Sequence, residues 1–385
     1  MDERDQARPS TPPEASGILD SREIFWRNLQ PWLQQSGYTL RPRFRRGWIP
    51  SWKIPGSDAH LLVAEDSWGL LRGQIMDAVR DADGLQVALK RVSKSKHPFE
   101  EGIHRFLSAP GSEISQDPTN HCVPLLDVLQ PPNDADLQIL VMELLRKCDS
   151  PPFDTVGEVV DFFNQIFEGL QFMHKHLVAH RDCSSNNIMM TSRGMYPDGF
   201  HPQYQTSSLD MKKSVTHSMT RTQRPPKYYF IDFGISVRLN AEERRSALPI
   251  VGADQTVPEY QNDGHVDPQD PFATDIYFLG NLIREEFLDG QSDPRYQISP
   301  GRVGFEFMRS LVTDMVNVDP TKRPTIDEVV LRFDKIKSGL GSWKLRSRVR
   351  SKDEIRIFNI PRILNHWKRK IRYIVDGTPP IPVYG

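Results

Sequence analysis

HRDCSSNNIMM, residues 180–190, is the stretch that decides the interpretation of this chain. It places Asp182 five positions before Asn187 and then continues as a short apolar run. A second run, YYFIDFG at 228–234, predicts a buried strand that delivers Asp232 to a turn allowed by Gly234. Phosphoryl transfer needs a carboxylate that orients a hydroxyl group, together with oxygen ligands for Mg²⁺. We therefore assign the first role to Asp182 and predict Asn187 and Asp232 as the metal ligands.

The bulk properties exclude several classes of protein. The chain has 385 residues, of which 38% are hydrophobic, and its formal net charge is −1. This balance gives no overall field that favours nucleic acid or a membrane, so no specific nucleic-acid binding is expected. The three cysteines show no ligand spacing, which is typical of a reducing compartment. We see no leader and no apolar run that could cross a bilayer, and we expect an intracellular protein, cytoplasmic or nuclear.

The first strands are predicted ahead of residue 93. Residues 75–80 and 86–92 alternate as two antiparallel strands around a turn at Asp83-Gly84. Lys90 ends the apolar run VALK at 87–90. Contact with two phosphates gives a lysine a reason to point inward at this position. An ordinary lysine on an edge strand is the alternative.

Several motifs together resemble the eukaryotic protein kinases. HRDCSSNN matches the catalytic loop H-R-D-x-x-x-x-N, and the later DFG matches the metal motif. VALK looks like the strand that carries the phosphate lysine. VPE at 257–259, DIYFLG at 275–280 and DPTKRP at 319–324 follow in the family order. The residues of two motifs, NIMM after the catalytic Asp and KYYFIDFG, are similar to those of the expanded kinase-like proteins of mushroom-forming fungi.

The resemblance covers residues 60–338 and implies an α+β, two-lobed fold. It places a small antiparallel lobe with one helix at 60–145 and a mainly helical lobe at 146–338. The chain before it divides into a disordered N-terminus, 1–19, and a helix with an extended basic flank, 20–59. That helix begins with a capping box at Asp20 and Glu23. The basic flank interleaves arginines with aromatic residues, as single-strand nucleic-acid platforms do, but an extended flank docked on the small lobe, with its arginines in solvent, is the favoured interpretation.

The same resemblance implies a nucleotide site for ATP. Met142 takes the position beside adenine, and backbone groups of Glu143 and Leu144 face its edge. Met189 packs below the base. A glutamate should steady Lys90, and Glu100 fits this role better than Glu101. The remaining nucleotide contacts are expected from three residues of the small lobe: Gly73, Ile75 and Ala88.

Two departures from the family pattern affect the expected site. The first concerns nucleotide binding, and the second concerns the transferring phosphoryl group. Only Gly73 remains of the glycine-rich loop, because Trp68 and Leu70 occupy the other glycine positions. Backbone N–H groups close over phosphate most easily at glycines, so a looser grip or a different loop path is expected. In addition, Ser184 stands where serine/threonine kinases place a lysine, and a cation for the transferring phosphoryl group is missing.

Two further segments lie outside the family pattern. Residues 191–227 form an insertion rich in Ser, Thr, Pro, Lys and Arg, which predicts a mobile loop. After Gly341 the chain turns basic, and the tail at 339–385 contains an amphipathic helix that starts at Pro361. One interpretation is that this helix binds an anionic membrane surface or a partner, as the helices that bind calmodulin do. The alternative is a tail helix packed on the large lobe.

The sequence therefore predicts an ATP- and Mg²⁺-dependent protein kinase, a phosphotransferase with an alcohol group as acceptor. A serine or threonine acceptor is favoured over tyrosine. Intact Lys90, Asp182, Asn187 and Asp232 speak for catalysis. The eroded loop and Ser184 leave open a pseudokinase that binds nucleotide as a scaffold. A small-molecule phosphotransferase is disfavoured, because such enzymes generally lack the pair expected between Glu259 and Arg323. An adaptor built on the basic flanks is a further alternative.

Overall fold

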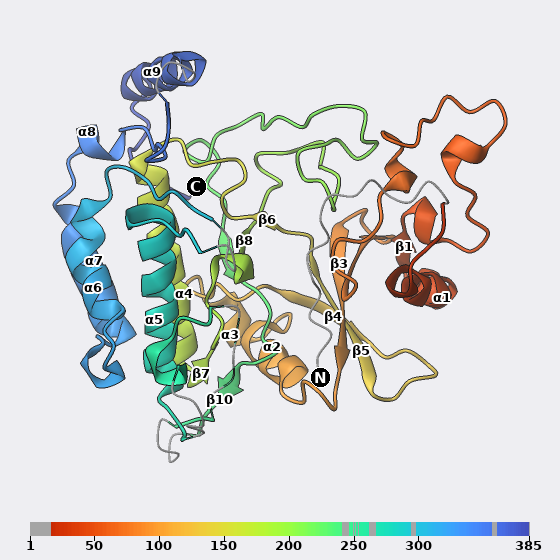
Figure 1. Cartoon of the computed structure of the whole chain (residues 1–385), viewed down its shortest axis with the longest axis horizontal. Coiled ribbons are helices and arrows are strands. Elements are labelled where there is room, and N and C mark those ends of the chain that lie inside the picture. Colours follow the sequence, from red (N-terminus) through yellow and green to blue (C-terminus); the bar gives the residue numbers. More distant parts are fainter. Residues whose placement is uncertain are drawn as a thin grey trace. The chain divides into compact units, whose positions relative to one another are not determined.

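A computed structural model describes residues 17–240, 246–248, 250, 252, 254–261, 267–293, 298–355 and 360–384. The expected disorder of residues 1–16 therefore lies outside the described residues. The chain divides into two units (Figure 1). Unit 1 comprises residues 1–98, 123–146 and 196–218, and unit 2 comprises the remainder.

A five-stranded antiparallel sheet forms the centre of unit 1. Its order is β1-β2-β3-β5-β4, and every neighbouring pair is antiparallel. The buried side chains Met76, Leu89 and Val141 lie in its core. The strands are β1 (Tyr38–Leu40), β2 (Ile75–Arg80), β3 (Gln86–Ser93), β4 (Leu125–Leu129) and β5 (Leu137–Glu143). The predicted hairpin at 75–92 is confirmed, and Gly84 makes its turn with a positive φ of 71°.

The N-terminal flank is part of this unit. Helix α1 (Ser21–Gln35) begins at the predicted capping box, where Asp20 and Glu23 bond each other's backbone N–H. Its Trp26 and Leu33 are fully buried in the same core as the sheet. The flank then supplies β1, which pairs with β2 from Tyr38↔Arg80 to Leu40↔Ala78. The sequence placed the start of the small lobe at residue 60, but the sheet begins further upstream, at β1.

Two arginines of the basic flank, Arg41 and Arg43, are paired with carboxylates inside unit 1. Arg43 is 5% exposed and binds Glu23, with Nε–Oε1 at 2.8 Å. Arg41 binds Asp77 of β2 through two bonds of 2.7 and 3.1 Å and also binds Glu65. A guanidinium held by buried carboxylates is not available to nucleic acid. The docked arrangement is therefore the one found, with Arg41 and Arg43 paired and Arg45 and Arg46 exposed.

The insertion at residues 191–227 is not a structureless loop. Its residues Tyr196–Ser218 belong to unit 1. Arg146, 2% exposed, stacks on the rings of Tyr196 and Phe200 at 4.2 and 4.8 Å and donates to the Gln205 carbonyl. Trp68 stacks on Tyr204 at 4.2 Å. The composition concealed these contacts, because a few aromatic and amide side chains hold a segment that is otherwise polar.

Unit 2 is mainly helical and packs around α4 (Val156–Lys175). Phe162, Phe163 and Phe167 of α4 meet aromatic rings from the later helices. Its other helices are α2 (Glu100–Ser108), α3 (Glu113–Gln116), α5 (Pro271–Ile283), α6 (Arg309–Met315), α7 (Ile326–Ser338), α8 (Ser342–Leu345) and α9 (Ile360–Val375). The capping box predicted at Thr325 and Glu328 begins α7.

Short strands and single turns complete the chain. β7 (Val178–Ala179) pairs with β10 (Val237–Arg238), and β8 (Ile188–Met190) pairs with β9 (Tyr228–Phe230), both antiparallel. Strand β6 (Arg146–Lys147) falls at the border of the two units. The single turns are η1 (Pro42–Phe44), η2 (Ser51–Lys53), η3 (Glu65–Ser67), η4 (Ser185–Asn187), η5 (Pro258–Tyr260), η6 (Arg284–Leu288), η7 (Glu306–Met308) and η8 (Pro320–Lys322).

The predicted α+β class is confirmed, with one antiparallel unit and one mainly helical unit. The boundaries differ from those drawn on the sequence. Unit 1 extends upstream through α1 and takes in much of the insertion, whereas α2 clusters with the helical unit. The tail after residue 339 also belongs to unit 2. Among the described helices, none combines the length and the hydropathy needed to cross a bilayer.

The contacts of residues 196–218 predict that trypsin will spare Lys212 and Lys213 in the native protein for longer than a mobile loop would allow. Replacing Arg146 by Ala removes both ring contacts and the bond to Gln205, so cleavage in this segment should become at least several-fold faster. Thr216→Ala, at an exposed side chain of the same segment, keeps both lysines and is the control for a change that leaves the contacts intact. Equal cleavage rates in wild type and Arg146→Ala would show that these contacts do not hold the segment.

Candidate active site

Asp275 of α5 fixes the loop that begins at His180. Its carboxylate is fully buried, and it accepts the backbone N–H groups of His180 at 2.8 Å and Arg181 at 2.6 Å. His174 of α4 contacts the same carboxylate at 3.0 Å. Arg181 takes a positive φ of 68°, a strained conformation that surrounding bonds must maintain. Asp275, the first residue of the DIYFLG motif, thus anchors the backbone of this loop.

Asp182 and Asn187 are brought together by the single turn η4. The Asn187 side-chain amide donates to the Asp182 carboxylate at 2.8 Å and to the Asp182 carbonyl at 3.0 Å. Asn187 is buried, whereas Asp182 is partly exposed. Because the amide nitrogen is used in these bonds, the amide oxygen of Asn187 is directed away from Asp182. The pair therefore presents one carboxylate and one amide oxygen.

The pairing of β8 with β9 delivers Asp232 to the same loop. Ile188 pairs with Phe230, and the Ile231 N–H donates to the Asn187 carbonyl at 2.9 Å. Asp232 has a positive φ of 66°, and its Oδ1 accepts the Gly234 N–H at 3.1 Å. Unit 2 therefore brings Asp182, Asn187 and Asp232 together, as the sequence predicted.

The donor chemistry at this place fits Mg²⁺. Asn187 and Asp232 offer an amide oxygen and a carboxylate, which are hard ligands of the kind that Mg²⁺ prefers. Within the described ranges, no cluster of three or more His, Cys, Asp or Glu side chains forms a fuller metal cage. Mg²⁺ characteristically keeps water and phosphate oxygens among its ligands, so two protein ligands are sufficient. Their role as metal ligands stays a prediction.

Phe233 links this turn to α2. Its ring lies 5.1 Å from the His104 ring and 5.4 Å from the His180 ring. His104 follows Glu100 by one helical turn, so the two share a face of α2. Glu100 is 2% exposed, whereas Glu101 forms an i,i+4 pair with Arg105 at 2.6 Å. Glu100 is thus the inward glutamate, which supports the preference for Glu100 over Glu101 as the partner of Lys90.

The sheet of unit 1 gathers most of the predicted nucleotide residues. Ile75 of β2 lies opposite Lys90, and Ala88 lies opposite Met142 of β5. Since side chains alternate along a strand and paired residues share a face, these four lie on one face of the sheet. Lys90 is 8% exposed. The roles assigned to them, and to Met189 on β8 of unit 2, stay predictions.

The connection before β2 replaces the glycine-rich turn. Residues 41–74 join β1 to β2, so the different loop path expected from the missing glycines is found. The Gly73 carbonyl accepts Trp26 Nε1–H of α1 at 3.0 Å. A Cβ at Gly73 would lie 2.6 Å from the Arg22 side chain. Gly73 therefore makes room for α1, and this reason for the glycine is separate from the predicted nucleotide contact.

The insertion covers backbone that was predicted to face adenine. Gln205 Nε2–H donates to the Leu145 carbonyl at 3.1 Å, directly after Glu143 and Leu144. Gln203 donates to Asp77 at 3.1 Å, and Asp77 lies opposite Ala88 on the same face of the sheet. The Leu144 N–H is itself bonded to Gln86 of β3 at 3.0 Å. The sequence did not predict these contacts, because two glutamines in a polar loop do not indicate which groups they will bond.

Gly252 is a second residue that sequence reasoning missed. A Cβ at this position would lie 2.8 Å from Asp182 Oδ1 and 3.2 Å from the Arg181 carbonyl. Any side chain at 252 would therefore have to displace the Asp182 carboxylate. A lone glycine in a loop carries no sequence signal for such an approach.

The Ser184 hydroxyl, two residues after Asp182 in the chain, is buried and has no hydrogen-bond partner among the described residues.

Glu259 and Arg323 form a buried, two-pronged ion pair in unit 2. The two N–H···O bonds measure 2.8 and 2.7 Å, and the side chains are 6% and 0% exposed. Thr274 of α5 donates to Glu259 at 3.0 Å, and Arg323 donates to the Ala273 carbonyl at 3.0 Å. The pair predicted from VPE and DPTKRP is thus present, and it ties the end of the segment after Asp232 to α5.

Comparison with known proteins agrees with this arrangement. Residues 72–332 match the protein kinase domain model. The "Light-sensor Protein kinase" of Ceratodon purpureus is 26% identical over 226 residues, covering 53% of this chain and 16% of that protein. The "Serine/threonine-protein kinase CAK1" of Saccharomyces cerevisiae is 31% identical over 91 residues, covering 24% of this chain and 17% of that protein. The chain belongs to the protein kinase domain family. It spans less than a fifth of the length of these two relatives.

The Glu259–Arg323 pair makes a prediction for stability. Arg323→Ala should lower the free energy of unfolding by about 3–5 kcal/mol, because it leaves a buried carboxylate without its partner. Removing both charges in Glu259→Gln/Arg323→Met should cost clearly less than the single change. Urea unfolding monitored by tryptophan fluorescence measures both. Lys322→Ala, at a neighbouring exposed lysine paired with Asp319, is the control and should stay within about 0.5 kcal/mol of wild type. A loss below about 1 kcal/mol in Arg323→Ala would contradict the structural role.

Proposed function

We propose that this chain is an ATP- and Mg²⁺-dependent protein kinase that transfers the γ-phosphate to a serine or threonine hydroxyl group. The observation that carries the proposal is the joint placement of Asp182, Asn187 and Asp232 on backbone held by Asp275 and by the β8–β9 pair. Membership of the protein kinase domain family supports it. The printed name of one relative, a serine/threonine kinase, supports the choice of acceptor.

Each residue would contribute positioning or charge. Asp182 would accept a hydrogen bond from the acceptor hydroxyl and orient its oxygen toward the phosphorus. Asn187 and Asp232 would hold Mg²⁺, which when bound neutralises charge on the phosphate oxygens. Lys90, steadied by Glu100, would bind the nucleotide phosphates. In-line transfer of this kind relies on positioning and electrostatics, which a rigid loop provides without reorganisation.

A nucleotide-binding pseudokinase is the second candidate, and three observations favour it. Residues 41–74 replace the glycine-rich turn, and Gln205 occupies the Leu145 carbonyl. Ser184 offers a hydroxyl where a lysine would supply positive charge. Against this, Asp182, Asn187 and Asp232 are all present and are held on adjacent backbone of unit 2. The Glu259–Arg323 pair further supports a protein acceptor over a small molecule.

The source and compartment stay proposals from the sequence. The wording of NIMM and KYYFIDFG supports a relation to the expanded kinase-like proteins of mushroom-forming fungi. The cysteines, which are all unpaired and buried, support an intracellular location in the cytoplasm or nucleus.

Transfer of labelled phosphate from ATP, to the chain itself and to a generic protein substrate, tests the proposal. We expect Mg²⁺-dependent transfer that falls by at least about a hundredfold in Asp182→Asn and in Asp232→Asn, because each change removes a carboxylate from the reacting centre. Asp327→Asn, at an exposed carboxylate of α7, is the matched control and should retain full activity.

The outcomes separate the two candidates. Loss of transfer in both site variants, with the control active, supports the kinase. No transfer by the wild type, with nucleotide still raising the unfolding temperature, favours the pseudokinase. Transfer that survives both variants would refute the assignment of Asp182 and Asp232.

A further inference from the structure

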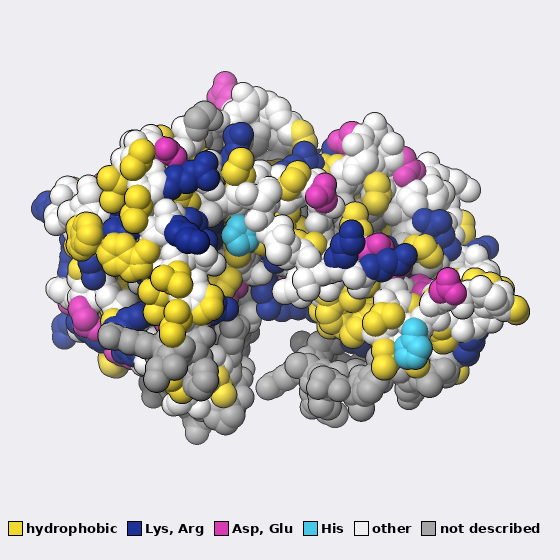
Figure 2. All heavy atoms as spheres, turned by 90° about the horizontal axis from the view of Figure 1, so that it is seen from above, with side chains coloured by type: hydrophobic (Ala, Val, Ile, Leu, Met, Phe, Trp, Pro, Cys, Tyr) yellow, Lys and Arg dark blue, Asp and Glu magenta, His cyan; other side chains and the backbone are white. Residues whose placement is uncertain are grey.

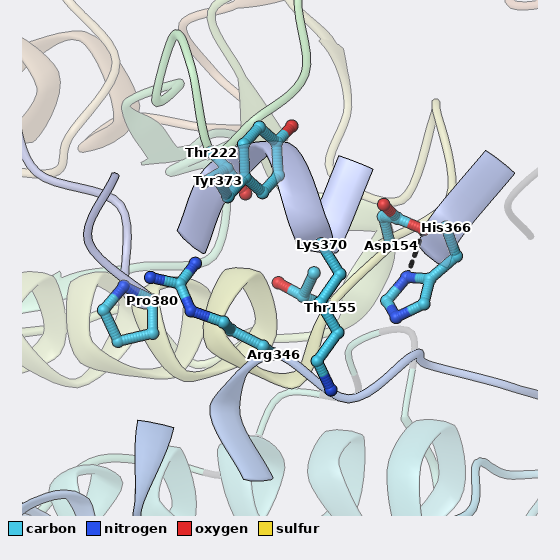
Figure 3. Close-up of a pocket in the computed structure, with 8 residues that line it drawn as sticks. All are labelled: Asp154, Thr155, Thr222, Arg346, His366, Lys370, Tyr373 and Pro380. Atoms are coloured by element: carbon cyan, nitrogen blue, oxygen red, sulfur yellow. Dashed lines mark hydrogen bonds and ion pairs between the residues drawn. The ribbon is translucent and has the colours of Figure 1, made fainter. Parts of the chain in front are cut away.

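The C-terminal helix α9 packs on unit 2 through its polar side. His366 Nδ1 lies 3.2 Å from the Asp154 carboxylate (Figure 3). Arg369 Nε donates to the same carboxylate at 2.9 Å. Tyr373 bonds Thr220 at 2.6 Å. Burial raises the pKa of Asp154, but the bonds from His366 and Arg369 outweigh it, so the carboxyl lies below its usual pKa. The polar side of α9 is therefore neutralised and fixed against the protein.

Packing through the polar side leaves the hydrophobic side of α9 in solvent. Leu364 is 56% exposed, Trp367 is 46% exposed and Ile371 is 58% exposed. Trp343 of α8, 67% exposed, stands beside them with its ring 6.3 Å from that of Trp367. We call this surface the apolar crest. It comprises Trp343, Ile360, Leu364, Trp367, Ile371, Ile374 and Val375.

The orientation is the reverse of that of an ordinary tail helix. The sequence predicted either a surface for binding or a tail packed on the large lobe, and a packed tail would bury its apolar residues. The structure gives a packed helix whose apolar residues point outward. Seen from above, the part of unit 2 that carries α9 shows hydrophobic side chains gathered beside lysines and arginines (Figure 2). Contiguous exposed apolar surface of this kind marks a site of interaction.

Charge identifies the occupant of the crest. Residues 360–375 contain five cations and no acidic residue. Lys368 and Arg372 are exposed and, by helical spacing, flank one edge of the crest. Lys370, in contrast, is only 5% exposed and lies on the packed side of α9 with its ammonium 3.6 Å from the Trp343 ring centroid, so it adds no exposed cation to the crest. Arg372 faces Asp376 at 3.4 Å, but both side chains are well exposed, so this pair leaves the positive field largely intact.

We propose that the apolar crest is a docking surface for an anionic membrane. A helix that lies in the plane of a membrane has an apolar side with tryptophan and leucine, and its polar side is rich in lysine and arginine. The cations flanking the crest would meet lipid phosphates and serine headgroups, while Leu364, Trp367 and Ile371 enter the boundary of the acyl chains. The chain would rest on the surface without crossing the bilayer.

Two other occupants fit the structure less well. A protein that encloses a helix on all sides would have to break the bonds from Asp154 to Arg369 and His366, whereas a flat surface leaves them in place. A second copy of this chain would bring two sets of flanking cations together, and like charges at an interface oppose association. An anionic membrane surface would take up the apolar side chains of the crest and also pair with the cations.

Co-sedimentation of the full chain with phosphatidylcholine vesicles, made with and without phosphatidylserine, tests the proposal. We expect binding to the vesicles that contain phosphatidylserine, with weaker binding as salt rises. Leu364→Ser/Ile371→Ser should weaken it by about tenfold or more, because two inserted side chains become polar. Lys368→Glu/Arg372→Glu should weaken it by a similar factor by reversing two charges. These side chains are exposed, so both variants should keep the wild-type unfolding temperature.

Leu331→Ser provides the matched control, since Leu331 of α7 is 57% exposed and lies outside the crest. It should bind vesicles as the wild type does. The proposal is overturned if the wild type does not sediment with anionic vesicles, or if the two crest variants sediment as well as Leu331→Ser. It is equally overturned if the crest variants only abolish a dimer seen by light scattering, because the crest would then be an interface between two copies.

Discussion

The catalytic arrangement depends on one buried carboxylate. Asp275 has no exposed surface and accepts two consecutive backbone N–H groups at the start of the loop. Hydrogen bonds to a charged group contribute about 1.5–3 kcal/mol each, enough to hold Arg181 at positive φ. From that fixed start the turn η4 places Asp182 against Asn187, and the β8–β9 pair places Asp232. A rigid base of this kind lets a few polar groups act without reorganising.

The two units have diverged from the family pattern to different degrees. Unit 2 keeps the loop, the buried Glu259–Arg323 pair and the Phe233 ring between two histidines. Unit 1 keeps the sheet, but it replaces the short phosphate turn by residues 41–74 and lays the insertion over Leu145 and Asp77. Unit 2 thus keeps more of the family pattern than unit 1 does.

The sequence predicted those parts of the fold that local patterns determine. The β2–β3 hairpin follows from alternation and Gly84, α7 follows from its capping box, and the catalytic loop follows from a fixed spacing. It did not predict β1, which is only Tyr38–Leu40 and pairs across a long connection. It misjudged the insertion, because single contacts such as Arg146 on Tyr196 leave no periodic trace. The sequence also did not predict that the apolar side of α9 faces solvent. A helical pattern defines two faces but does not determine which one is buried.

The central claim is that Asp232 and Asn187 hold Mg²⁺ for a bound nucleotide, and calorimetric titration of ATP tests it most directly. The measurement compares wild type with Asp232→Asn, each with Mg²⁺ and with the metal removed by a chelator. Our account predicts that Mg²⁺ tightens binding by about tenfold or more in the wild type and has little effect in Asp232→Asn, because that variant lacks the carboxylate ligand. Equal affinity in all four titrations, or no binding of ATP by the wild type, would contradict the account.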